Sequence, residues 1–131
     1  MKTDAVTKPR KIKEQPAVYI INKAEIKPAF IKERIPFSQE RIDAFCKKWK
    51  ISEFSFFGSI LRDDFRPDSD VDVLVSFSAD AGWSLFDLVD MQQELETMFN
   101  RKVDLVEKEA LRNPYRRHSI LNGREILYAS Q

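Results

Sequence analysis

Apolar residues in the middle of the chain repeat with the period of an α-helix. Ser38 can cap such a helix, and four apolar residues follow at the spacing i, i+3, i+4 and i+7: Ile42, Phe45, Cys46 and Trp49. Because this spacing places the four side chains on one face, an amphipathic helix is predicted over residues 38–49. Cys46 lies on that face and is interpreted as a core residue.

Further helical signals follow Ser84 and Ala110. Ser84 and Asp87 have the spacing of a capping box, which predicts a long helix from this point. The apolar stripe expected for this helix consists of Leu85, Leu88, Val89, Leu95, Met98 and Phe99. The segment from Ala110 to Leu121 is expected to be helical in parts, with an interruption at Pro114.

Several short apolar segments have the composition of β-strands. A buried strand is predicted over 51–57, which contains three Phe residues, and a second over 71–77, where alternate apolar residues share a face. Third and fourth strands are expected at 102–106 and 125–129, and 17–22 is a candidate for a short edge strand. The order of the elements predicts an α/β (α+β) fold, a small mixed sheet with helices packed on one face.

The composition fits one domain with a packed core. The chain has 131 residues, of which 43% are hydrophobic, and this length is about that of a single domain. The single cysteine, Cys46, excludes an intrachain disulfide or a cysteine-based zinc site and fits a reducing compartment. No apolar run approaches the ~20 residues of a membrane span, and the N-terminus lacks the apolar core of a secretory signal. We therefore expect a soluble cytoplasmic protein with no membrane partner.

Charge is distributed unevenly along the chain. Residues 1–36 carry nine Lys/Arg and four Asp/Glu, a net charge of +5, whereas residues 37–131 carry thirteen and seventeen, a net charge of −4. This pattern divides the chain into a partly flexible basic N-terminal arm, 1–36, and a domain, 37–131. The arm either remains solvated or docks on a partner. Direct binding to nucleic acid is not expected, because the arm has neither an Arg-rich run nor interleaved aromatic residues.

A Gly-Ser pair follows the first predicted strand and opens a short helical stretch. Free backbone N–H groups at such a junction can bind an anion such as a phosphate. Gly58 has no Cβ to block close approach, and Ser59 offers a hydroxyl donor. Taken alone, a Gly-Ser pair is most often an ordinary turn.

Three aspartates in or beside predicted strands complete the candidate chemistry. Asp70 and Asp72 are two residues apart, so their carboxylates share a face, and two such carboxylates favour a hard divalent cation such as Mg²⁺. Asp104 lies inside an apolar segment, where an unpaired buried carboxylate is costly unless a neighbouring strand places it beside the other two. Each aspartate alone has an ordinary structural explanation, such as a strand start or a pair with Lys102. Together with the Gly-Ser turn they predict a metal-assisted phosphoryl-transfer site.

Three motifs in this part of the chain resemble one family. The segments 57–62 (FGSILR), 69–75 (SDVDVLV) and 102–106 (KVDLV) resemble the signature of the DNA polymerase β-like nucleotidyltransferases. The resemblance is closest to their minimal nucleotidyltransferase (MNT) subgroup, the antitoxins encoded beside HEPN-domain toxins. It covers about residues 38–129 and leaves the basic arm without a counterpart.

The resemblance implies roles for particular residues. The nucleotide-binding residues would be Gly58, Ser59, Arg62 and Ser69, and the catalytic and metal-binding residues Asp70, Asp72 and Asp104. In that family the Gly-Ser turn holds nucleotide phosphates, the Asp-x-Asp pair binds Mg²⁺, and the later strand aspartate orients or activates the attacking hydroxyl. Many members have Gly after the arginine, where this chain has Asp63.

The reaction implied by the family is transfer of AMP from ATP to a tyrosine of the cognate HEPN toxin, an RNase, which neutralises it. One alternative keeps the enzyme class and changes the acceptor to a small molecule or an RNA end, although such enzymes usually carry an additional substrate domain. A second alternative is an antitoxin that masks its toxin by binding alone. The presence of all three aspartates and the Gly-Ser pair favours catalysis.

Overall fold

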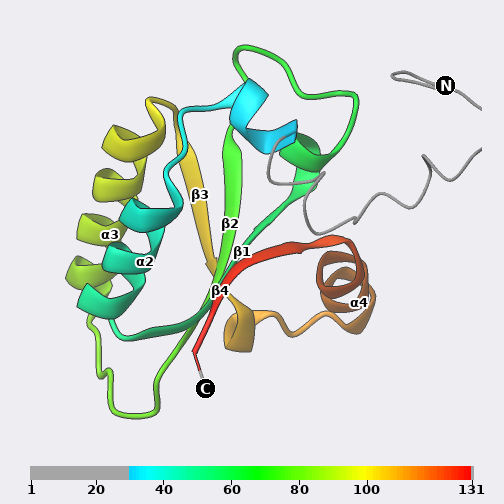
Figure 1. Cartoon of the computed structure of the whole chain (residues 1–131). Coiled ribbons are helices and arrows are strands. Elements are labelled where there is room, and N and C mark those ends of the chain that lie inside the picture. The colour runs from blue at the N-terminus through cyan, green and yellow to red at the C-terminus, as the bar shows by residue number, and fades with distance from the viewer. Residues whose placement is uncertain (1–29, 131) are drawn as a thin grey trace, which may run out of the picture.

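Four strands form one mixed sheet in the order β3-β2-β1-β4 (Figure 1). β1 (Ile51–Phe57) runs antiparallel to β2 (Val71–Phe77) and to β4 (Glu125–Ala129), while β2 and β3 (Val103–Glu107) are parallel. The mixed sheet is therefore confirmed, with each of these strands within one residue of its predicted position.

The N-terminal limit of the domain differs from the one that charge suggests. The computed structural model describes residues 30–130, so the candidate strand 17–22 lies outside the described residues. Residues 30–34 are helical, and Ile31 and Ile35 are 0% and 3% exposed in the main hydrophobic core. Both isoleucines fall within the predicted arm, because a count of charges does not detect two apolar residues at helical spacing.

Helices cover both faces of the sheet (Figure 1). α2 (Gln39–Lys48) and α3 (Leu85–Phe99) pack side by side on one face, as predicted, and contribute to one core with residues of β1 and β2. α4 (Pro114–Gly123) lies over the opposite face, which the prediction left uncovered. Among residues 30–130 no helix combines the length and the apolar character needed to cross a membrane.

The helix starts agree with the capping residues seen in the sequence. The Ser38 hydroxyl accepts a hydrogen bond from the Arg41 N–H at the start of α2, and Ser84 and Asp87 form the predicted capping box of α3.

The predicted apolar stripe of α3 needs correction. Met91 is fully buried, whereas Leu85 and Val89 are 74% and 47% exposed. The stripe that meets the sheet follows the strict i, i+3, i+7 spacing of Leu88, Met91, Leu95, Met98 and Phe99.

Aromatic side chains dominate the core between the sheet and the two long helices. Phe56 of β1 makes edge-to-face contacts with the rings of Phe37, Phe54 and Phe99, at centroid separations of 5.4–6.1 Å. Each such pair contributes about 0.5–1.5 kcal/mol beyond the area that it buries. Cys46 is fully buried beside this cluster, as predicted. Burial raises the pKa of its thiol to about 12, so the thiol stays protonated at neutral pH.

The segment after β3 differs from the prediction at Pro114. A short 3-10 turn, η3 (Lys108–Ala110), follows β3, and Pro114 begins α4 instead of interrupting a helix. The Asn113 side chain caps α4 by accepting from the N–H groups of Tyr115 and Arg116. Proline suits the first helical position because its N–H would have no partner there. Leu111 and Ile120 pack with Phe57 and Leu74 and close the second face of the sheet.

Candidate active site

Two of the three predicted aspartates are cross-strand neighbours. The sheet register pairs Phe57 of β1 with Asp72 of β2, and Asp72 with Asp104 of β3. Directly opposite residues share a face and lie within side-chain reach. Phe57 packs with Ile120 of α4, so this row of three residues faces the α4 side of the sheet. The long-range pairing of Asp72 with Asp104, expected from the sequence, is thus present.

Gly58 stands immediately against the Asp72 carboxylate. It is the first residue of the 3-10 turn η2 (Gly58–Leu61) and has a φ of +77°. A Cβ added at this position would lie 2.1 Å from Asp72 Oδ2. Two independent reasons therefore require glycine at this position: the left-handed backbone conformation and the close approach of the Asp72 carboxylate.

The electrostatic environment of Asp72 is dominated by its burial and by like charges. Partial burial raises the pKa of Asp72, and the neighbouring carboxylates of Asp104 and Asp70 raise it further. Arg62 and Arg116 oppose this shift. The three predicted aspartates are therefore close enough to interact, with two arginines near them.

Asp104 and Asp70 are exposed, and Asp72 is half-buried. The sequence argument that Asp104 is a buried carboxylate in need of a partner is therefore wrong. Asp104 lies in β3 at the edge of the sheet, where water reaches its side chain. Among residues 30–130 no three Asp, Glu, His or Cys side chains are arranged as a preformed metal cage.

The donor chemistry of the three aspartates nevertheless suits Mg²⁺. Carboxylate oxygens are its preferred ligands, and it is commonly held by one or two carboxylates together with substrate phosphates. Besides partial burial, repulsion by the carboxylates of Asp104 and Asp70 raises the pKa of Asp72, and a bound cation would reduce this repulsion. Binding of Mg²⁺ by these residues stays a prediction.

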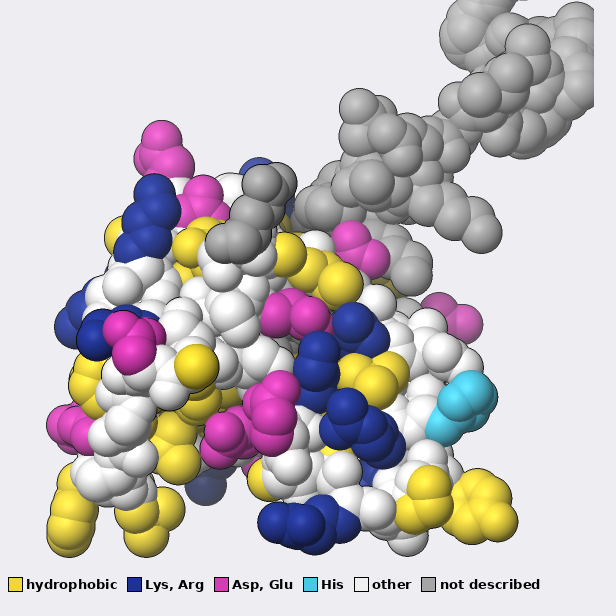
Figure 2. All heavy atoms as spheres, turned by 90° about the horizontal axis from the view of Figure 1, so that it is seen from below, with side chains coloured by type: hydrophobic (Ala, Val, Ile, Leu, Met, Phe, Trp, Pro, Cys, Tyr) yellow, Lys and Arg dark blue, Asp and Glu magenta, His cyan; other side chains and the backbone are white. Residues whose placement is uncertain are grey.

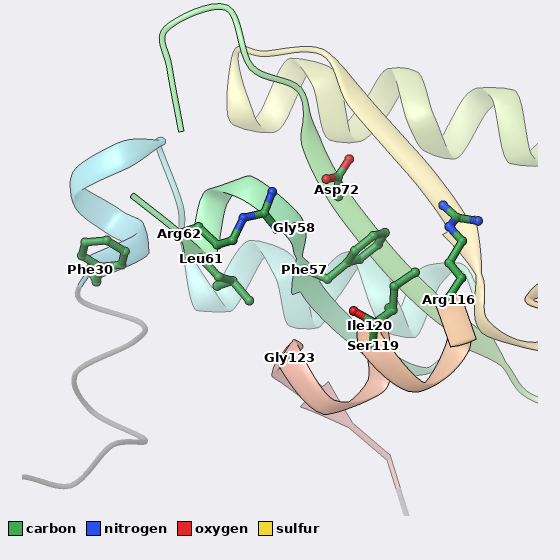
Figure 3. Close-up of a pocket in the computed structure, with 10 residues that line it drawn as sticks. All are labelled: Phe30, Phe57, Gly58, Leu61, Arg62, Asp72, Arg116, Ser119, Ile120 and Gly123. Carbon is green, nitrogen blue, oxygen red and sulfur yellow. The ribbon is translucent and has the colours of Figure 1, made fainter. Parts of the chain in front are cut away.

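A cavity of about 520 Å³ opens between η2 and α4 (Figure 3). Gly58, Arg62 and Asp72 from the predicted set line it. The remaining lining residues are Phe30, Phe57, Leu61, Arg116, Ser119, Ile120 and Gly123. In this view Asp72 lies between Arg62 on one side and Arg116 on the other. An anionic ligand in this cavity would meet two cations and the glycine turn.

The other two predicted nucleotide-binding residues, Ser59 and Ser69, are not among the residues that line the cavity. The Ser59 carbonyl accepts from the Arg62 N–H and closes η2. Arg62 forms an exposed ion pair with Asp64, which lowers the pKa of that carboxyl. The Ser69 hydroxyl accepts from the Arg66 N–H in the turn before Asp70. Asp63 stands where many family members have glycine. Its φ is not positive, since within residues 30–130 the non-glycine residues with positive φ are Lys50 and Asn100. The backbone at this position therefore does not need a glycine.

Sequence reasoning missed the contribution of α4. Arg116, Ser119, Ile120 and Gly123 line the cavity and follow the helical spacing i, i+3, i+4 and i+7. Asn113-Pro114 is the sequence signal that could have identified these residues. Interpreted as an N-cap followed by proline at the first helical position, the pair predicts that a helix begins there. On the surface, Asp/Glu side chains lie next to a group of Lys/Arg side chains (Figure 2).

A glycine turn against a strand carboxylate, with a second carboxylate in register and arginines across a cavity, has the features expected of a phosphoryl-transfer site. The chain belongs to the nucleotidyltransferase domain family, whose sequence profile matches residues 39–127. The resemblance to the minimal nucleotidyltransferases is thereby confirmed, and the protein is a nucleotidyltransferase.

Relatives and solved structures of the same class are similar to this chain. The protein adenylyltransferase MntA of Thermococcus cleftensis is 32% identical over 82 residues, which are 63% of this chain and 78% of the relative. A toxin–antitoxin crystal structure with AMP-PNP has a TM-score of 0.59 at 20% identity, covering 72% of this chain and 76% of that chain. A tri-AMPylated Shewanella oneidensis HEPN toxin in complex with MNT antitoxin gives a TM-score of 0.52 at 20% identity, covering 71% of each chain. At these identities the structures show the shared fold.

Proposed function

We propose that this protein is an antitoxin that transfers AMP from ATP to a tyrosine of a HEPN-type RNase toxin, with Mg²⁺ as cofactor. The observation that carries the proposal is the row formed by Asp72 and Asp104 in register, with Gly58 against the Asp72 carboxylate. Similarity to the protein adenylyltransferase MntA supports the reaction. Similarity in fold to toxin–antitoxin complexes supports the kind of partner.

The residues of the cavity bind and orient the triphosphate. Backbone N–H groups of the η2 turn at Gly58 and Ser59 face the phosphates, as at other turn-to-helix anion sites. Arg62 and Arg116 neutralise phosphate charge from opposite sides of the cavity. Asp70, Asp72 and Asp104 would hold Mg²⁺, which supplies charge neutralisation at the phosphates when bound. Positioning and charge neutralisation account for most of the catalysis in such transfers.

The acceptor enters from the exposed side of the site. Asp104 is accessible at the sheet edge, so it can accept the proton of a tyrosine hydroxyl supplied by a second protein. The bond that forms joins the tyrosine oxygen to the α-phosphorus of ATP. The bond that breaks joins this phosphorus to the oxygen of the departing pyrophosphate.

Intact mass spectrometry tests the proposal directly. The protein is incubated with ATP, Mg²⁺ and a candidate HEPN-domain toxin. Each AMP transferred adds about 329 Da to the toxin, the mass of the group that nucleotidyl transfer leaves on its acceptor. The double substitution Asp70→Asn/Asp72→Asn and the single substitution Asp104→Ala should each abolish the increment. Asp68→Asn, an exposed aspartate of the same loop, is the matched control and should transfer normally.

The same variants separate transfer from masking. Full neutralisation of the toxin by Asp70→Asn/Asp72→Asn, with no mass change for any variant, would replace the enzymatic proposal by an antitoxin that acts through binding. Tyrosine as the acceptor is checked by peptide mapping of the modified toxin. Modification of another residue type would correct this part of the proposal alone.

Calorimetry tests the role of the metal without any acceptor. ATP should bind with Mg²⁺ and much more weakly without it, because three carboxylates near the cavity repel an unneutralised triphosphate. Asp72→Asn should reduce the dependence on Mg²⁺. Equal affinity in the two conditions for the wild-type protein would remove Mg²⁺ from the proposal.

A further inference from the structure

Residues 62–70 connect the glycine turn to Asp70 without belonging to a helix or strand. η2 ends at Leu61 and β2 begins at Val71. Within this connection Phe65 and Ser69 are half-buried, and the other residues are exposed. The sheet holds both ends of this segment, because Gly58 follows β1 and Asp70 precedes β2, and β1 pairs with β2. The conformation of the residues between these ends depends on contacts from outside the segment.

Arg34 holds the first end of the connection. Its guanidinium group donates to the carbonyl oxygens of Ser59 and Ile60, each at 3.2 Å, and also to that of Arg62. These carbonyls lie at or just after the end of η2, and that of Ser59 also accepts from the Arg62 N–H. One side chain thus fixes the whole C-terminal end of the turn that carries Gly58 and Ser59.

Arg101 holds the second end. Its Nη1 donates to the carbonyl oxygens of Arg66 at 2.7 Å and Ser69 at 2.9 Å. The turn between these residues is closed by Ser69 N–H donating to the Arg66 carbonyl and by Arg66 N–H donating to the Ser69 hydroxyl. Arg101 therefore fixes the residue immediately before Asp70.

Phe65 joins the two arginines through its ring. The Arg34 guanidinium lies 5.3 Å and the Arg101 guanidinium 4.4 Å from the centroid of this ring, both within the range of cation–π contact. Arg34 also lies 4.1 Å from the centroid of Phe30, which lines the cavity. Because a guanidinium can stack on a ring and donate in its own plane at the same time, arginine fits these positions and lysine does not.

We infer that the Arg34–Phe65–Arg101 stack orders residues 62–70, the segment between the Gly58–Ser59 turn and β2 that carries Asp70 at its end, which makes these three residues positioning residues for nucleotidyl transfer. The inference rests on the proposed function for its catalytic consequence. Its structural part, the ordering of residues 62–70, can be measured without any activity. Arg34 belongs to the helical residues 30–34 and binds the carbonyls of η2, although the family profile begins only at residue 39.

The kinetic experiment uses substitutions that remove one property at a time. Phe65→Leu removes the ring and Arg101→Lys keeps the charge but loses the paired donors, so kcat for AMP transfer should fall about 10- to 100-fold, as expected when reacting groups are misplaced. The KM for ATP should change much less than kcat, because Gly58, Asp72 and Arg116 line the cavity and lie outside residues 62–70. Phe65→Tyr keeps the ring and should restore kcat. Arg41→Lys, an exposed arginine on α2, is the control and should have no effect.

Amide hydrogen exchange provides the readout that does not depend on transfer. The N–H groups of Arg62, Arg66 and Ser69 should exchange faster in Phe65→Leu and Arg101→Lys, while that of Ile42, bonded to the Ser38 carbonyl, should not. Unchanged exchange and kcat, or an equal rise in exchange across the sheet, would overturn the inference. If the wild-type protein transfers no AMP but exchange rises only in 62–70, the proposed function fails and the ordering role of the stack stands.

Discussion

Gly58 occupies a position where any side chain would collide with the Asp72 carboxylate. Its φ of +77° is a conformation that L-residues rarely adopt, and the nearest atom to an added Cβ belongs to the aspartate. Gly82 has a similar φ of +63° but open space around it. The two glycines therefore separate the cost of the backbone conformation from the cost of the close approach.

Gly58→Ala should destabilise the fold by more than the ~1–2 kcal/mol that the left-handed conformation costs, because its Cβ also meets the Asp72 carboxylate, and it should abolish AMP transfer. Gly82→Ala should lose only the conformational part of the free energy of unfolding and keep its activity, because its Cβ meets nothing within 4 Å. Urea denaturation and the intact-mass assay measure the two effects. Normal transfer by Gly58→Ala would show that the contact with Asp72 has no role in the site.

Asp72→Asn should make the protein more stable at neutral pH. Partial burial, then Asp104 and Asp70, raise the pKa of Asp72 above its ordinary value of 3.8. The folded state then binds this proton more tightly than the unfolded state does, so stability falls as pH rises from the ordinary value through the raised one. The asparagine variant lacks that loss. Its advantage should be present at pH 7 and disappear below the ordinary value.

Urea denaturation of wild type and Asp72→Asn at pH 7 and near pH 3 checks this expectation. Addition of Mg²⁺ should stabilise the wild type at pH 7 and stabilise the variant less, since a ligand stabilises the state that binds it. A variant less stable than the wild type at pH 7 would show that the carboxylate makes a favourable contact that outweighs the repulsion.

α4 is the element whose placement depends most on its own cap. Ile120 is its buried residue, so burial gives it less support than α2 and α3 receive. The Asn113 side chain accepts two backbone N–H groups at its start, at 2.9 and 3.1 Å. Arg116 and Ser119 reach the cavity only if this helix lies correctly over the sheet. The cap is therefore part of the active-site architecture.

Asn113→Ala should cost about 1 kcal/mol of stability, typical of a lost N-cap, and weaken ATP binding several-fold by loosening α4. Asn113→Asp should restore both properties. Ser38→Ala removes the corresponding cap of α2 and should cost stability without weakening ATP binding, since α2 lines no part of the cavity. Calorimetry and urea denaturation give the two values. Equal effects of the two cap deletions on ATP affinity would contradict the assignment of α4 to the site.

At the scale of the whole molecule, the domain begins before the residues that the family profile matches. The profile starts at residue 39, yet Ile31 and Ile35 belong to the main core and Arg34 fixes the η2 turn. Residues 30–36 are thus continuous with both the core and the active site. A boundary drawn from charge alone would cut through this structure.

A chain that begins at residue 37 should be less stable by several kcal/mol than one that begins at residue 30. The shorter chain lacks two buried isoleucines, and removal of one such side chain from a core typically costs about 2–5 kcal/mol. ATP binding should weaken as well, because Arg34 is lost. Thermal and urea denaturation compare the two chains. Equal stability would show that residues 30–36 contribute little to the core.

The local features of this protein could be predicted from its amino-acid sequence. Ser38 and Ser84 marked helix starts because capping requires only residues within one turn. Apolar composition identified β1 and β2, and the Gly-Ser and Asp-x-Asp motifs identified the nucleotidyltransferase family. These signals depend on neighbours in the chain, so they can be read without knowledge of the fold.

The contacts between residues that are distant in the chain could not be predicted in this way. Strand pairing set Asp72 beside Asp104 and left Asp104 exposed at the sheet edge, a result that depends on register and strand order. Helix packing brought Arg116 to the cavity, and long-range contacts placed Arg34 and Arg101 on the loop before Asp70. The exposure of a carboxylate and the partners of an arginine are properties of the assembled chain, because they depend on atoms that the local sequence does not specify.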